Sequence, residues 1–172
     1  MKRQSNSDSG LRRYLITLIS ALFVATAASA SPTFDKPDFA YPRDVIRDAD
    51  AALAQAVRDG DAAVQLLALM QKTKAAESID ADSLKTSIAD VLQYAARQTA
   101  PDAKALFNLY AAQLYNKYRA DNRWRMSGNT LPQGPRPADI AEWDTAAFTA
   151  VVDSLLAEAW KAADNTPIER WA

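Results

Sequence analysis

Apolar residues recur at steps of three and four from residue 44 onward, which is the spacing of one face of an α-helix. Asp59-Gly60-Asp61 interrupts the first stripe, and this sequence predicts the end of one helix and the N-cap of the next. The second stripe is short and fades at Lys72-Thr73-Lys74, and a third stripe follows Asp80 or Asp82 as its cap. The three stripes consist of Val45, Ala49, Leu53, Ala56 and Val57; Val64, Leu67 and Ala68; and Leu84, Ile88, Val91, Leu92 and Ala95. No stretch alternates with period two, so strands are not expected.

The fourth helix is expected to be the central element of the fold. Thr99-Ala100-Pro101-Asp102 gives it a start with proline in the first turn, and the helix runs to about Asn122. Apolar and aromatic residues of this helix lie around most of its circumference, which is typical of a helix that is contacted on several sides. These residues are Leu106, Phe107, Leu109, Tyr110, Ala111, Leu114, Tyr115 and Tyr118.

The clearest helical stripe of the chain follows a loop that runs from Met126 to Ala138. The helix is predicted from Asp144 to about Ala163, and its stripe assigns Trp160 to the core. The stripe consists of Phe148, Val151, Val152, Leu155, Leu156, Ala159 and Trp160. Together the five patterns predict an all-α fold, either an irregular bundle of about five helices or the start of a longer helical array.

The first 30 residues have the layout of a cleavable secretory signal. A basic start is followed by an apolar run from Leu15 to Ala27, and Ala28-Ser29-Ala30 places small residues where signal peptidase reads the chain. The apolar run is shorter than the roughly 20 residues that a membrane-spanning helix needs. We therefore expect cleavage after Ala30 and export to the periplasm or the medium without stable membrane insertion. Arg12-Arg13 leaves both the general secretory route and the twin-arginine route open.

The mature chain is expected to contain an extended lead segment, residues 31–43, and a helical domain, residues 44–172. Thr166-Pro167-Ile168-Glu169 has the form of a capping box, and only three residues follow it. Three residues are too few to propagate a helix. We expect this sequence to be the front of a longer polypeptide, cut at the start of its next helix; the alternative is a frayed tail.

Composition excludes several kinds of chemistry. The chain contains no cysteine and no histidine, which rules out Ser-His-Asp and Cys-His catalysis, and no zinc site or histidine-ligated haem is expected. Removal of the signal leaves 16 basic and 20 acidic residues, a net charge of −4. A mildly acidic exported domain is not expected to bind nucleic acid. No cofactor is expected.

Two groups of residues are candidate sites. Asp139, Glu142 and Asp144 could form a carboxylate pair for hydrolysis, but acidic residues are favoured at a helix start in any case, so the protein is not expected to be an enzyme. Trp143, just before a helix cap, is either a hydrophobic staple or an exposed platform. Basic and aromatic residues near the end of the fourth helix form a candidate interaction surface; its residues are Arg119, Arg123, Trp124 and Trp143. The alternative is that the arginines meet the helix dipole while the rings pack.

Short motifs in a fixed order run from the fourth helix to the end of the chain. They are Leu114-Tyr115-Asn116-Lys117-Tyr118, Asn122-Arg123-Trp124-Arg125, Asp139-Ile140-Ala141-Glu142-Trp143-Asp144, the stripe of the last helix, and Thr166-Pro167-Ile168. In order and approximate spacing, these motifs resemble the N-terminal helical region of bacterial alpha-2-macroglobulin-type proteins. In that family these residues are scaffold, and none is catalytic.

The resemblance implies a large exported protein that traps proteases, a broad-spectrum endopeptidase inhibitor. A protease cuts a bait segment, and the body then closes around it, often with capture through a cysteine thioester. The bait and the thioester are absent from this chain, so proteases are expected partners only through downstream domains. The alternative is a stand-alone periplasmic module that binds a peptide, a cell-wall glycan or other envelope partners.

Overall fold

The computed structural model describes residues 39–129 and 136–164, all within the unit Pro37–Thr166 of the chain. Five long helices make up most of these residues, together with the one-turn helix α6 and the 3-10 turn η2. The elements are α2 (Pro42–Asp59), α3 (Ala62–Ile79), α4 (Ser83–Arg97), α5 (Pro101–Asp121), α6 (Arg123–Met126), η2 (Ile140–Glu142) and α7 (Thr145–Asp164). These two ranges contain no strand, which confirms the predicted all-α fold. The signal peptide, most of the lead segment and the capping box at Thr166 lie outside the described residues.

The turn between α2 and α3 forms where the sequence predicts it. Gly60 adopts a left-handed φ of 70°, a conformation that costs glycine little because it has no Cβ. The N–H of Asp61 donates to the carbonyl of Ala56 at 2.9 Å, and the Asp61 carboxylate accepts the N–H of Val64 at 3.0 Å. Helix α2 begins at Pro42, two residues before the predicted start, because proline fits the first turn of a helix.

Helix α3 is longer than expected. The prediction that it fades at Lys72-Thr73-Lys74 is wrong, because the helix continues to Ile79. Its second half buries Thr73 and Ala75 and has no stripe of large apolar residues, so the pattern is weak there. Helix α3 packs against α2, α4 and α5. Lys72 is covered as well: its Nζ lies 2.9 Å from Asp50 on α2 and 3.5 Å from Asp90 on α4.

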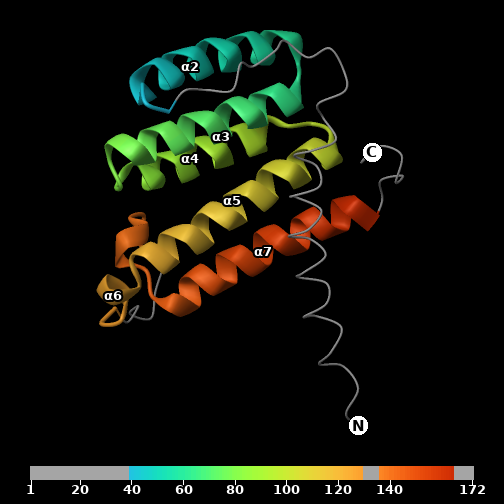
Figure 1. Cartoon of the computed structure of the whole chain (residues 1–172). Coiled ribbons are helices and arrows are strands. Elements are labelled where there is room, and N and C mark those ends of the chain that lie inside the picture. The colour runs from blue at the N-terminus through green and yellow to red at the C-terminus, as the bar shows by residue number, and fades with distance from the viewer. Residues whose placement is uncertain (1–38, 130–135, 165–172) are drawn as a thin grey trace. The chain divides into compact units, whose positions relative to one another are not determined.

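Helix α5 is the central helix of the described residues, as its sequence predicts. It packs against α3 and α4 on one side and α7 on the other, as Figure 1 shows, while α2 packs mainly on α3. Helix α4 turns its predicted stripe toward this core. Nine residues of α5 are buried: Ala105, Phe107, Asn108, Tyr110, Ala111, Ala112, Leu114, Tyr115 and Tyr118.

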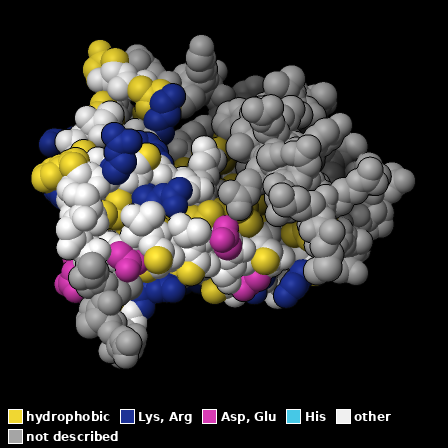
Figure 2. Space-filling view, turned by 90° about the horizontal axis from the view of Figure 1, so that it is seen from below, with side chains coloured by type: hydrophobic (Ala, Val, Ile, Leu, Met, Phe, Trp, Pro, Cys, Tyr) yellow, Lys and Arg dark blue, Asp and Glu magenta, His cyan; other side chains and the backbone are white. Residues whose placement is uncertain are grey.

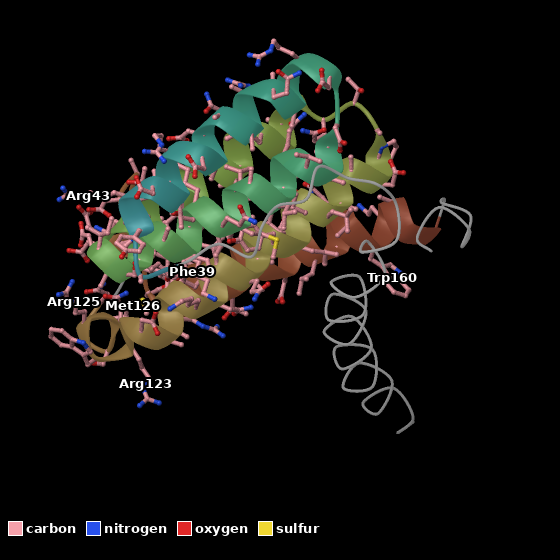
Figure 3. The ribbon with its side chains drawn as sticks, turned by 45° about the horizontal axis from the view of Figure 1, so that its top comes forward. Phe39, Arg43, Arg123, Arg125, Met126 and Trp160 are labelled. Atoms are coloured by element: carbon pink, nitrogen blue, oxygen red, sulfur yellow. The ribbon has the colours of Figure 1, made fainter. Side chains whose placement is uncertain are left out.

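Helix α7 buries part of its predicted stripe. Phe148, Val152 and Ala159 are buried, and Leu155 packs against the core while partly exposed. The assignment of Trp160 to the core is wrong, because this side chain is 41% exposed and is directed away from the bundle in Figure 3. At about 100° per residue, Trp160 lies about 120° around the helix from Phe148, so it falls at the flank of the buried face.

Phe148 is expected to be the most sensitive residue of this face. Its side chain is fully buried, so Phe148→Ala should lower the free energy of unfolding by about 3–5 kcal/mol through lost burial and a cavity. Urea denaturation followed by circular dichroism measures this loss. Trp160→Ala is the matched control, and equal losses in the two variants would contradict the facing of α7.

Tyr110 should make the fold sensitive to alkaline pH. Burial raises the pKa of Tyr110 to about 12, and its hydroxyl hydrogen bonds to Thr73. Because this pKa exceeds the unfolded value of about 10, the contribution of the neutral phenol to stability is complete below pH 10 and is lost as pH rises toward 12.

We expect Tyr110→Phe to be less stable than the parent at pH 8 by about 0.5–1.5 kcal/mol, because the hydrogen bond to Thr73 is lost. The difference should shrink or reverse near pH 11.5, since phenylalanine does not ionise. Urea midpoints at the two pH values measure it, and a gap that stays constant would refute the assignment.

Candidate interaction surface

Four aromatic rings form the base of the candidate surface, and we call them the aromatic cluster: Tyr115, Tyr118, Trp143 and Phe148. The ring of Tyr115 stacks on Trp143 with centroids 5.8 Å apart and an interplanar angle of 10°. Phe148 lies 5.2 Å from Trp143 and 5.9 Å from Tyr118, measured between ring centroids. Stacked and edge-to-face pairs at these distances are favourable beyond the area they bury. The cluster joins α5, the segment before α7 and α7 itself.

Trp143 is the hydrophobic staple of α7 and not an exposed platform. Asp144 caps the helix, because its carboxylate accepts the N–H of Ala147 at 2.8 Å. Trp143 precedes this cap and contacts Phe148 four residues inside the helix, which is the staple arrangement. Only 6% of Trp143 is exposed, so its ring is not available to a partner. Trp143 therefore does not belong to the candidate surface.

The backbone around Trp143 is held by hydrogen bonds from the other side of the loop. The Asn129 amide donates to the carbonyls of Ala141 and Trp143 at 3.0 and 3.1 Å. The indole N–H of Trp143 donates to the carbonyl of Pro137 at 2.8 Å. The guanidinium of Arg136 lies over the indole ring, 4.8 Å from its centroid. These contacts therefore hold both sides of the loop, residue 129 and residues 136–143, against the aromatic cluster.

Asp139 ties this base to α4. Its carboxylate accepts the N–H of Ala141 at 2.9 Å and pairs with the Lys85 ammonium at 3.1 Å. The Ala141 N–H, and then Lys85, lower the pKa of Asp139. The hydrogen bond to Asp139 in turn raises the pKa of Lys85. Asp139 therefore has structural partners at η2 and α4.

The exposed part of the candidate surface is α6. Trp124 is 72% exposed, and the Arg125 guanidinium lies 5.0 Å from the centroid of its ring. Figure 3 shows Arg123 and Arg125 directed away from the bundle at its α6 end. Arg125 comes no closer than 4.0 Å to Asp82. The alternative that the rings near the end of α5 pack into the fold is therefore correct for Tyr115 and Tyr118. The ring of Trp124, by contrast, is exposed to solvent.

Arg119, the fourth candidate residue, is partly covered between α5 and α7. Its guanidinium donates to the Thr149 hydroxyl at 3.0 Å and to the Asn116 side-chain oxygen at 3.1 Å. Of the four candidate residues, Arg123 and Trp124 are exposed, Arg119 is partly buried and Trp143 is buried. The position of Trp143 one residue before Asp144 indicated a staple, and no local rule indicated the exposure of Trp124.

The acidic residues considered for catalysis do not form a free pair. Asp139 and Asp144 both accept backbone N–H groups at element starts, and Glu142 is exposed. In the described ranges, no group of three or more acidic side chains is arranged to hold a metal ion. The same ranges include no helix long and apolar enough to cross a membrane.

Comparisons with family models, curated proteins and solved structures found no match for this chain.

Asn129 is expected to control the order of the aromatic cluster. Asn129→Ala removes both hydrogen bonds to the carbonyls of Ala141 and Trp143, which should cost about 1–3 kcal/mol. We also expect a weaker near-UV circular dichroism signal, because Trp143 loses part of its fixed surroundings. Ser127→Ala is the control, since that hydroxyl donates only to the Trp124 carbonyl within α6. An unchanged near-UV spectrum in Asn129→Ala would contradict this role.

Proposed function

We propose that the chain is a non-catalytic helical module at the N-terminal side of an exported alpha-2-macroglobulin-like protease trap. The observation that carries the proposal is the convergence of the resembling motifs on one packed cluster. Tyr115 and Tyr118 come from one motif, and Trp143 and Phe148 come from two others. Their centroid distances of 5.2–6.2 Å form a continuous set of ring contacts. Scaffold is the role that the resemblance assigns to these residues.

Protease capture itself would belong to regions beyond this chain. The sequence contains no cysteine from which a thioester could form. A rigid helical unit suits a folded start or docking piece, because its buried aromatic contacts give it one arrangement. Its setting would be the periplasm or the medium, in keeping with the expected signal peptide at residues 1–30. Proteases would be partners of the whole protein, and envelope proteins could be partners of the module.

The size and inhibitory behaviour of the natural product test this proposal. An antibody raised against residues 39–129 should detect an exported product far larger than the 18.8 kDa of this chain. The purified product should block a protease from cutting a folded protein substrate and spare a dipeptide substrate, because an enclosed protease still admits small molecules. A product no larger than this chain, or equal inhibition of both substrates, would refute the proposal.

A second candidate function is a stand-alone module that binds a peptide or a cell-wall glycan in the periplasm. The exposed ring of Trp124 favours it, since a solvated indole beside Arg125 is an unusual use of a large apolar side chain. Binding to purified peptidoglycan should then fall in Trp124→Ala and persist in Trp160→Ala. Equal retention of both variants would remove this candidate.

A further inference from the structure

Helix α6 leaves a large apolar ring in water although Met126 of the same turn is buried. Trp124 is 72% exposed, more than any other large apolar side chain in the described ranges. Two residues later, Met126 is only 4% exposed and belongs to the core. The turn therefore has an inner side that packs and an outer side that faces solvent. We use the name α6 knob for Arg123, Trp124 and Arg125 on this turn.

The α6 knob is basic and has little internal neutralisation. It carries two arginines and no acidic residue. Among the described residues, no carboxylate lies within ion-pair distance of Arg123, and Arg125 reaches Asp82 only at 4.0 Å. Nearby Asp121 is engaged by Lys117 at 2.7 Å. The basic character is local, since the whole chain has 20 basic and 21 acidic residues. Figure 2 shows side chains of both charges on the described part of the face that it presents.

The backbone of the α6 knob is already ordered. The N–H groups of Arg125 and Met126 donate to the Asn122 carbonyl at 3.0 and 3.2 Å. The Ser127 hydroxyl closes the turn on the Trp124 carbonyl at 2.9 Å. A partner would not need to order this backbone, so less of the binding free energy would be lost on association.

The shape and charge of the knob indicate the kind of partner. Small-molecule sites are concave, whereas α6 lies at one end of the bundle (Figure 1), and Arg123 and Arg125 are directed outward from it (Figure 3). Tryptophan and arginine are the residues most enriched where protein interfaces concentrate their binding free energy, and such anchors fill a pocket on the other protein. Two arginines beside the ring require acidic residues opposite them. An anionic lipid surface is disfavoured by the net charge of −4 that remains after removal of the expected signal.

We propose that the α6 knob docks into an apolar pocket rimmed by aspartate or glutamate on a folded protein partner, with Trp124 in the pocket and Arg123 and Arg125 on its rim. This interface is separate from protease trapping, and failure of the protease-trap proposal leaves it intact.

Site-specific photocrosslinking in cells that export the full chain tests the docking. Trp124 is replaced by p-benzoyl-phenylalanine, and the same replacement at Trp160 is the control. Position 124 should yield one protein adduct whose crosslinked peptide maps beside Asp or Glu residues around an apolar depression. The adduct should disappear in the double variant Arg123→Glu, Arg125→Glu. No adduct, an adduct to lipid or glycan, a crosslink to a second copy of this chain, or the same adduct from position 160 would overturn the proposal.

Binding of the purified, mapped partner gives the quantitative test. Trp124→Ala should weaken the dissociation constant at least tenfold, and Trp160→Ala should stay within twofold of the parent. The charge-reversed double variant should bind more weakly and its salt dependence should invert, because glutamates opposite Asp or Glu repel and salt screens that repulsion. Circular dichroism should be unchanged in all variants, since the altered side chains are exposed. Equal affinities for the parent and Trp124→Ala would refute the proposal.

Discussion

The packing of Phe148 against the rings of α5 and against Trp143 is the contact on which the arrangement of this domain depends. Among the long helices, α7 has its extensive contacts with α5 alone, so the α5–α7 interface holds it to the rest of the domain. The chain has no cysteine, and no disulfide can reinforce that interface. Phe148 is fully buried at the end where α7 begins, with Trp143 stapled over it. Farther along, the Asn108 amide donates to Glu158 at 3.1 Å and links the same two helices.

The same contact fixes the position of the α6 end. The stacked pair of Tyr115 and Trp143 joins the end of α5 to the chain that enters α7. Asn129 and Asp139 then tie the two sides of the intervening loop to this base, one through backbone carbonyls and the other through Lys85 on α4. Because α6 directly follows α5, its exposed side chains are attached to a backbone that the contacts of Tyr115, Asn129 and Asp139 hold in place. The α6 end is therefore ordered without a partner.

Sequence pattern was sufficient wherever one local rule decided the outcome. The left-handed Gly60 between two helices and the stripe of α4 each follow from spacing and backbone chemistry within a few residues. The apolar pattern ends too early in α3 because the buried positions of its second half are Thr73 and Ala75, and small or polar residues give no apolar stripe. The spacing by three and four predicts Trp160 in the core, but each such step matches a whole number of helical turns only approximately. Over twelve residues the difference adds up and turns the Trp160 side chain to the flank of the buried face.

The two tryptophans at the candidate surface mark the limit of sequence reasoning here. Trp143 and Trp124 both have charged residues on either side, and their burial differs because of tertiary contacts. Trp143 packs against Tyr115 and Phe148, whereas the ring of Trp124 is exposed, with the Arg125 guanidinium 5.0 Å from its centroid. A signal for Trp143 existed in its position one residue before Asp144, where a staple is expected. No equivalent local rule covers Trp124. An indole that the fold leaves in solvent, on a turn whose backbone is already fixed, contributes little to stability, and its chemistry therefore supports a role in binding and not in folding.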